Sequence, residues 1–287
     1  MRKTDLIVRP MQPDDIVHAM KLSSAEGWNQ TEKDWNLLIE RPQNVCLLAE
    51  FNKKIIGTTT AMNYGNQIAW IGMVLVDKEY RGQGVSKLLL TNILEKLKSF
   101  SSIKLDATPA GQQVYEKFDF KNEYIITRLV TGSMKKLSTD DDSSLVELIQ
   151  LKDLEEIIAF DKHVFGANRR QLIESLTQRY PHKAWLLKRN NSIAGFALGR
   201  EGNKYHQVGP VFGSTINDVK ILIRKGLNEL INQPVVIDVL NEKEDLITWL
   251  NSIGFTMQRH FVRMYKKENS FPGAVNKQHL ICGPEFG

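Results

Sequence analysis

The sequence predicts an α/β protein with a mixed sheet, made of two tandem copies of one fold, each a mostly antiparallel central sheet flanked by helices. Its 287 residues are about twice the length of a typical domain. Apolar residues change from alternate-residue spacing to helical spacing at a glycine-bearing turn, Gly82-Gln83-Gly84. Gly57 and Gly195 lie 138 positions apart, and Phe120 and Phe255 lie 135 apart. This nearly constant offset indicates a duplication.

In the first half, short apolar runs separated by turn residues predict an antiparallel meander of three strands. Apolar residues at helical intervals after Gly84 predict a helix with one apolar stripe. In chain order we expect a strand at 6–8, helices at 13–23 and 31–39, strands at 44–50, 54–62 and 67–76, a helix at 85–97, a strand at 103–105, a helix at 109–118 and a strand at 124–130.

The second half repeats this order of elements. We expect helices at 154–164 and 169–179, strands at 184–188, 192–199 and 207–212, a helix at 216–230, a strand at 235–240, a helix at 244–253 and a strand at 261–265. Glycine, serine, lysine and aspartate cluster between residues 131 and 144, which is typical of a linker. The chain is therefore predicted to divide into domains 1–132 and 144–287.

The composition, with 42% hydrophobic and 25% charged residues, is that of an ordinary globular protein and excludes disordered, collagenous and disulfide-scaffold classes. A formal net charge of +5 favours an anionic ligand without naming it. Basic residues are not interleaved with aromatic ones as a single-strand binding surface requires, so no nucleic-acid partner is expected.

Cysteine and histidine usage predicts neither disulfides nor a metal site. Cys46 and Cys282 form no CxxC pair, and the six histidines lack HxxxH or HExxH spacing. No run of about 18 apolar residues predicts a membrane span. The first residues lack the apolar core of a secretion signal, and we expect a cytoplasmic protein.

The turn at Gly82-Gln83-Gly84 opens a helix and predicts an anion-binding cradle, because backbone N–H groups converge there at the positive end of the helix dipole. A nucleotide-triphosphate loop would need GxxxxGK[ST], and a dinucleotide fold would need a third glycine where Lys87 stands. Neither pattern is present. The alternative to an anion-binding cradle is a turn in which the glycines are needed only for the backbone geometry.

Two segments carry a resemblance to a known superfamily. Residues 81–86, Arg-Gly-Gln-Gly-Val-Ser, follow the strand end 74–76 and resemble the acyl-CoA signature (R/Q)xxGx(G/A) of the GNAT N-acetyltransferases. Residues 115–120, Tyr-Glu-Lys-Phe-Asp-Phe, resemble the later LYEKxGF element. The whole chain resembles bacterial proteins with two GNAT-like units, of which the second has lost the signature: Gly213 to Asp218 stand in its place. Departures are Ser86 for the last glycine or alanine, Lys78 for a frequent proline and Asp119 for a glycine.

The resemblance implies that acetyl-CoA is the acyl donor and binds in the first unit alone. The pantetheine arm would run beside the strand end, and the pyrophosphate would lie on the N–H groups of the turn. The cofactor-binding residues implied are Val74, Leu75, Val76, Arg81, Gly82, Gln83, Gly84, Val85, Ser86 and Lys87. Tyr115 aligns with the tyrosine that protonates the departing thiolate.

The general base is not determined, because residues 69–73 contain no titratable group where several superfamily members carry a glutamate. Glu26 and Asp161 are the candidates, working through a water relay, and a solvated surface acid is the alternative for each. Glu26 lies in the loop that borders the acceptor site in this fold, together with the candidate substrate-binding residues Trp28 and Asn29. We expect residues 161–170 to face that loop across the cleft.

These observations predict an N-acetyltransferase that moves the acetyl group of acetyl-CoA to the amine of a small acceptor by direct attack, with the second unit walling off the acceptor pocket. A non-catalytic acyl-CoA sensor or interaction module is the alternative, and the second unit as a dimerisation platform is a third. The sequence does not identify the acceptor, the length of acyl chain or the oligomeric state.

Overall fold

The computed structural model describes residues 6–138 and 144–287. Its strands are β1 (Leu6–Pro10), β2 (Val45–Phe51), β3 (Lys54–Tyr64), β4 (Ile68–Val76), β5 (Ser102–Ala107), β6 (Lys121–Thr131), β7 (Val146–Leu148), β8 (Ala184–Arg189), β9 (Ser192–Arg200), β10 (His206–Gly213), β11 (Val235–Leu240), β12 (Thr256–Lys267) and β13 (Gln278–Leu280). Its α-helices are α1 (Ile16–Ala25), α2 (Glu32–Ile39), α3 (Val85–Lys96), α4 (Pro109–Glu116), α5 (Leu154–Phe165), α6 (Arg170–Arg179), α7 (Ile216–Asn228) and α8 (Glu244–Ser252).

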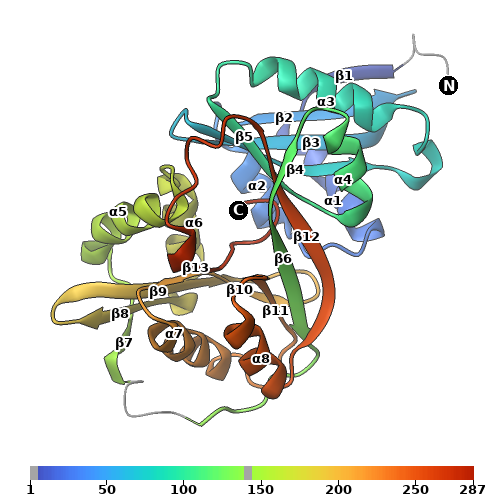
Figure 1. Ribbon diagram of the computed structural model, residues 1–287. Helices are drawn as coiled ribbons and strands as arrows, with labels where there is room; N and C mark the ends of the chain where they lie inside the picture. The colour runs from blue at the N-terminus through green and yellow to red at the C-terminus, as the bar shows by residue number, and fades with distance from the viewer. Residues whose placement is uncertain (1–5, 139–143) are drawn as a thin grey trace.

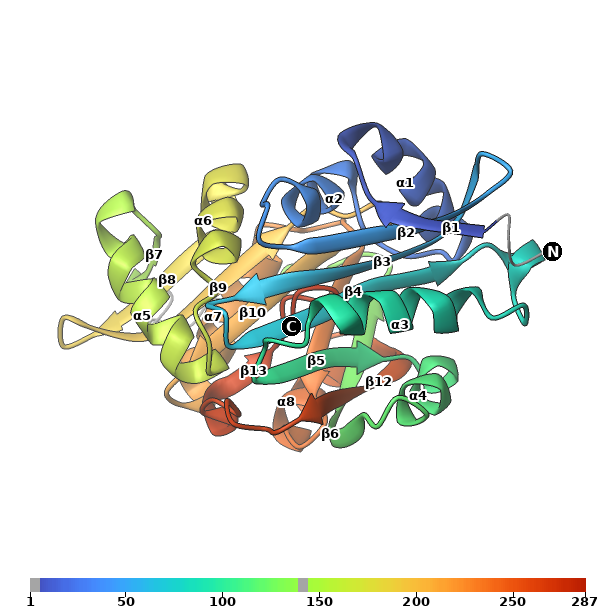
Figure 2. The same cartoon turned by 90° about the horizontal axis from the view of Figure 1, so that it is seen from above.

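The strands form one mixed sheet with the order β1-β2-β3-β4-β5-β12-β6-β11-β13-β10-β9-β8-β7 (Figure 1). Helices α1 and α2 cover one face of β2 to β4, and α3 covers the other (Figure 2). The apolar stripe of α3 is buried as its spacing predicts, with Leu89, Leu90 and Ile93 fully enclosed. The mixed α/β class and the repeated element order are confirmed. The short strands β7 and β13 were not predicted, since three residues leave too little pattern to detect.

The two halves of the sheet exchange strands. Strand β12, from the second half of the chain, lies between β5 and β6 and is antiparallel to both. On its other side β6 is antiparallel to β11. Two buried ion pairs fix the exchange: Arg263 of β12 contacts Asp106 of β5, and Arg128 of β6 contacts Asp238 of β11. The domain boundaries 1–132 and 144–287 stay a prediction. In the folded structure, each half of the chain contributes one strand to the sheet of the other half. Part of the predicted linker, residues 139–143, lies outside the described residues.

Strands β4 and β5 are paired in parallel only from Ile68–Ser102 to Ile71–Leu105. Beyond that point they separate. On the other edge of β4, Thr58 is opposite Leu75 and Thr60 is opposite Gly72, so two residues of β4 face one of β3 and form a β-bulge. The bulge bends the end of β4 away from β5 and leaves its main chain facing an opening.

The corresponding opening in the second half is filled by the chain itself. Strands β10 and β11 are parallel neighbours at residues 206–208 and 235–237, and β13 enters where they part, with Leu280 opposite Val211 and Val239. The tail of residues 281–287 then crosses to the first half, at the centre of the molecule (Figure 1). There Tyr64 Oη donates to the carbonyl of Phe286 (2.8 Å), and Trp70 Nε1 donates to that of Pro284 (3.0 Å).

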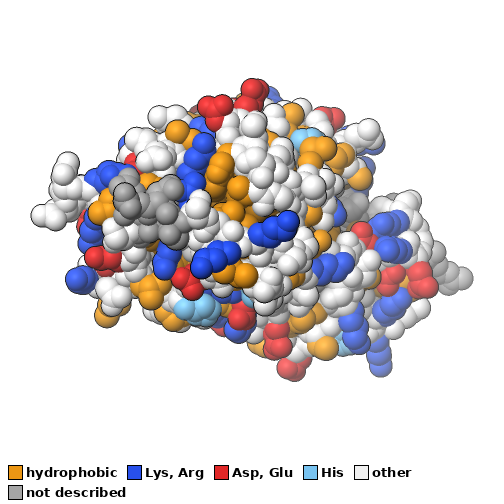
Figure 3. All heavy atoms as spheres, turned by 90° about the horizontal axis from the view of Figure 1, so that it is seen from below, with side chains coloured by type: hydrophobic (Ala, Val, Ile, Leu, Met, Phe, Trp, Pro, Cys, Tyr) orange, Lys and Arg blue, Asp and Glu red, His pale blue; other side chains and the backbone are white. Residues whose placement is uncertain are grey.

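Charge is distributed without a single basic stripe on the face that Figure 3 shows, where lysine and arginine side chains are scattered among acidic and hydrophobic ones. None of the helices within the described ranges is both long and apolar enough to traverse a lipid bilayer. In the same part of the chain, His, Cys, Asp and Glu side chains nowhere gather in threes as a metal site requires.

Candidate active site

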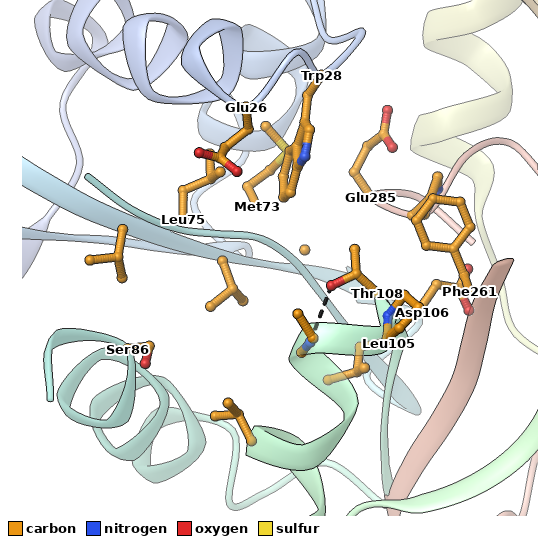
Figure 4. A pocket seen from close by; sticks show the side chains of 18 of the residues that line it. Glu26, Trp28, Met73, Leu75, Ser86, Leu105, Asp106, Thr108, Phe261 and Glu285 are labelled. Atoms are coloured by element: carbon orange, nitrogen blue, oxygen red, sulfur yellow. Dashed lines mark hydrogen bonds between the residues drawn. The ribbon is translucent and has the colours of Figure 1, made fainter. Parts of the chain in front are cut away.

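A cavity of ≈ 950 Å³ lies at the opening between β4 and β5 (Figure 4). Its walls come from both halves of the chain. The first half contributes residues 26–30, 71–76, 80–82, 84–86, 90, 105–106, 108–111, 114–115 and 128. The second half contributes Lys204, Tyr205, Val236, Gln258, Arg259, Phe261, Pro284 and Glu285. One continuous space therefore joins the glycine turn, the bare edge of β4 and the exchanged strands.

The glycine turn presents bare main chain to this space. Gly82 and Gly84 have φ of +73° and +84°, and a Cβ added at either would meet nothing within 4 Å. Gly84 is the N-cap of α3 and has no side chain to cap it, and the N–H of Leu88 is the first to bond back, to Gly84. The N–H groups of residues 85–87 have no acceptor within the helix. An anion can approach them directly.

The equivalent helix of the second half, α7, is closed by its own side chains. Thr215 Oγ1 accepts a hydrogen bond from the N–H of Asp218 (3.2 Å), and the Asp218 carboxylate lies in the same first turn. Arg189 Nε in turn donates to Asp218 (2.7 Å). A carboxylate already stands where a phosphate would have to bind, which fits the loss of the signature at residues 213–218.

The sequence-predicted cofactor residues mostly line the cavity: Val74, Leu75, Val76, Arg81, Gly82, Gly84, Val85 and Ser86. Gln83 and Lys87 are exposed and lie outside the lining. Gln83 Nε2 instead donates to the carbonyl of Glu79 (3.2 Å). The side chains of Leu75 and Ser86 are seen on opposite sides of the cavity in Figure 4.

Tyr115 lines the same cavity from α4. Its half-buried ring packs edge-on against Phe120, with ring centroids 5.8 Å apart, and its hydroxyl makes no hydrogen bond to a described residue. A Cβ on Gly111 would lie 3.1 Å from the ring, so the glycine leaves room for it. Burial raises the pKa of Tyr115 well above that of a free phenol. The side chain is therefore a protonated donor at neutral pH.

Glu26 also lines the cavity, where its carboxylate lies between the side chains of Arg81 and Lys78. Arg81 Nη2 donates to its Oε1 at 2.5 Å, and Lys78 Nζ is 3.9 Å from the same oxygen. Arg81 also donates through Nε to the carbonyl of Val76 (3.2 Å). These contacts tie Glu26 to the turn, and its role as the general base stays a prediction.

Asp161 is not brought to the cavity. It is fully buried in α5, where Arg169 donates two hydrogen bonds to its carboxylate (2.6 and 3.1 Å) and a third to the main-chain oxygen of Gly287 (2.6 Å). Neither Asp161 nor Arg169 lines the cavity, so this ion pair does not meet an acceptor bound there. The segment that meets the Trp28 loop is 202–205, between β9 and β10, instead of 161–170.

Trp28 lines the cavity, and Figure 4 shows its ring beside Met73. The neighbouring Asn29 also borders it, and its amide makes three hydrogen bonds that join the halves. Asn29 Oδ1 accepts from the N–H groups of Lys204 (3.0 Å) and Tyr205 (2.9 Å), and Nδ2 donates to the carbonyl of Tyr205 (3.0 Å). Asn29 therefore holds the 202–205 loop, and its role in binding substrate stays a prediction.

Replacing Asn29 with alanine is expected to lower the free energy of unfolding by about 2–4 kcal/mol, because the buried residue loses three part-buried hydrogen bonds between the halves. Urea unfolding measures this. The Asn36→Ala variant is the control, since its half-buried amide makes no side-chain hydrogen bond among those found in the structure, and it should change stability by no more than about 0.5 kcal/mol. Equal stability of the two variants would contradict the joining role.

Comparison with known families decides the identity of this architecture. Residues 15–120 match the model of the acetyltransferase (GNAT) family, and residues 157–280 match that of an acetyltransferase (GNAT) domain. The chain belongs to the GNAT acetyltransferase superfamily. It is a tandem GNAT protein, with both matches in one sheet and the cofactor signature in the first.

Relatives of this tandem GNAT protein extend over nearly the whole chain. A holothin acyltransferase of Pseudoalteromonas sp. (strain SANK 73390) is 22% identical over 92% of this chain and 88% of its own. A presumed acetyltransferase from Pyrococcus horikoshii has the same fold, with a TM-score of 0.83, 22% identity and coverage of 100% and 98%. A tandem GNAT protein from the clavulanic acid biosynthesis pathway has a TM-score of 0.62, 11% identity and coverage of 91% and 98%.

GNAT proteins generally use acetyl-CoA as the acyl donor, and this tandem GNAT protein is accordingly an acyltransferase. Its general reaction is acetyl-CoA-dependent N-acetylation.

Proposed function

We propose that the first unit, residues 1–132, binds one acetyl-CoA and passes its acetyl group to the amine of a small acceptor, with the second unit, 144–287, forming much of the acceptor wall. One observation carries this proposal. The bare glycine turn, the separated end of β4 and Tyr115 border a single cavity of ≈ 950 Å³.

The residues of the first unit fit the donor. Acetyl-CoA supplies an acetyl group activated as a thioester. The main-chain N–H groups of 82–87 bind its phosphates, with no side chain at Gly82 or Gly84 to block their approach. The bulged end of β4, residues 72–76, offers unpaired main-chain groups along the pantetheine path. A pantetheine arm bound along this edge of β4 would direct the thioester toward β6 and β12.

Direct attack by the amine is favoured over a covalent acyl-enzyme. Cys46 and Cys282 both lie outside the cavity lining. Burial raises the pKa of each thiol to about 12, so neither is a thiolate at neutral pH. Tyr115 supports the same route, because a protonated phenol can donate its proton to the sulfur as it leaves.

The acceptor side is formed by residues of both units. Trp28 borders it from the first unit, and Phe261 and Glu285 border it from the second (Figure 4). Together they make an apolar wall with one carboxylate, which suits a small amine carried on an apolar or aromatic body.

Titration with acetyl-CoA by isothermal calorimetry should give one site per chain, because only the first unit has an open glycine turn. Release of free thiol in the presence of a panel of primary amines then tests transfer. Two equivalent sites per chain would contradict the assignment to one unit. Binding of acetyl-CoA without turnover on any amine would instead support a non-catalytic sensor.

A further inference from the structure

Strand β4 has no acidic side chain in the cavity, and the tail of the chain occupies the place where one would stand. A Cβ added to Gly72 would lie 3.1 Å from both the Cα and the carbonyl oxygen of Glu285. The tail residues Pro284 and Glu285 line the cavity at this point. The main chain of Glu285 therefore packs against the bulged end of β4, and Figure 4 shows its side chain at this part of the cavity.

Glu285 belongs to a buried cluster with an excess of negative charge. Arg200 Nη1 donates to Asp34 (2.8 Å), and Arg200 Nη2 donates to Glu285 Oε1. The side chains are 1% to 5% exposed. One guanidinium thus serves two carboxylates, whereas Arg128 and Arg263 each bind a single aspartate. Burial, with the charge of Glu285 adding to it, raises the pKa of Asp34.

The second oxygen of Glu285, Oε2, is enclosed, and no group of residues 6–138 or 144–287 forms a hydrogen bond with it. The side-chain oxygen of Gln30, another residue of the cavity lining, is also enclosed without a partner. Leaving a buried acceptor unpaired costs free energy, and more so for a charged group. Arg200 Nε, a donor of the same cluster, is also enclosed without a partner among the described residues. The cluster nevertheless holds two carboxylates against one guanidinium, and an ammonium group supplies both a second positive charge and hydrogen bonds.

We propose that Glu285 is a catalytic residue that binds the acceptor as its ammonium and takes the first proton from it. This inference rests on the proposed function. An N–H bond of the ammonium breaks and the proton moves to Oε2 of Glu285, which passes it to water. The freed lone pair bonds to the thioester carbon. As the C–S bond breaks, sulfur takes its electron pair and a proton from Tyr115. The nitrogen loses its second proton, which restores Tyr115 through water, so one proton is released overall.

The test compares two small nucleophiles on the Glu285→Gln variant near neutral pH. Propylamine is mostly protonated there and needs a base, whereas hydroxylamine is mostly neutral and does not. We expect transfer to propylamine to fall by about 100-fold or more and transfer to hydroxylamine to stay within about threefold. The hydroxylamine rate also shows that the variant is folded, and calorimetry should show unchanged acetyl-CoA affinity.

The exposed Glu147→Gln variant is the control and should keep both rates. A propylamine rate that stays within threefold of wild type in Glu285→Gln would overturn the inference and leave the proposed function standing. An equal fall for both nucleophiles would overturn it too, because it indicates a structural effect. If the wild-type chain transfers acetyl to no amine of the panel, these two included, the proposed function fails and this inference fails with it.

Discussion

The Gly84→Val variant is expected to lose acetyl-CoA binding, with affinity reduced by about 100-fold or more. The branched side chain would stand over the first turn of α3, in space that is empty now, and would keep a pyrophosphate off the N–H groups of 85–87. The φ of +84° also disfavours valine, so the turn itself would shift. Isothermal calorimetry with acetyl-CoA measures the loss.

Gly254→Val is the matched control for this variant. Gly254 has a φ of +101°, and an added Cβ there would also meet nothing within 4 Å, but it lies outside the cavity. Both variants carry similar backbone strain, and only Gly84→Val should lose the ligand. Acetyl-CoA affinity that survives unchanged in Gly84→Val would show that the turn does not bind the cofactor.

The Tyr115→Phe variant is expected to lower kcat by about 100-fold while leaving acetyl-CoA affinity nearly unchanged. The ring still packs on Phe120, and only the proton donor is lost when the thiolate departs. Because burial raises the pKa of Tyr115, its acidic form persists to higher pH than that of a free phenol. Wild-type kcat should therefore show no alkaline fall from this group up to about pH 10.

Steady-state thiol release across pH checks both expectations. Tyr265→Phe is the control, because Tyr265 is also half-buried but does not line the cavity. It should leave kcat within about twofold of wild type. Equal turnover by Tyr115→Phe would reduce Tyr115 to a packing residue, and the acid would have to be sought elsewhere.

Local pattern was enough to predict most of the fold. The period of apolar residues located the main strands and helices, and the repeated offsets indicated two copies of one fold. The exchange of β6 and β12 was not predictable in this way. Both strands have ordinary local sequences, and the choice of neighbour depends on pairs such as Arg263–Asp106, which are 157 positions apart.

The site residues likewise separate into those that a local motif predicts and those that depend on distant contacts. Gly82, Gly84 and Tyr115 belong to local motifs, and the structure brings them to one cavity. Asp161 was chosen for its position in the second copy, but Arg169, eight residues later, binds it in the core. Glu285 was passed over because it lies in a short tail without periodicity. The one feature of the sequence that pointed to a carboxylate from elsewhere is that β4 carries no acidic residue, with a glycine at position 72.

The exchanged strands also constrain how the molecule is assembled during synthesis. By the time β5 and β6 have left the ribosome, the strand that belongs between them is still more than a hundred residues away, since β12 begins at Thr256. The nascent first unit holds two unpaired inner edges for that interval, and such edges invite pairing with other chains. The cavity is thus completed late, when β12 closes the gap and the tail behind it brings Pro284 and Glu285 to the wall.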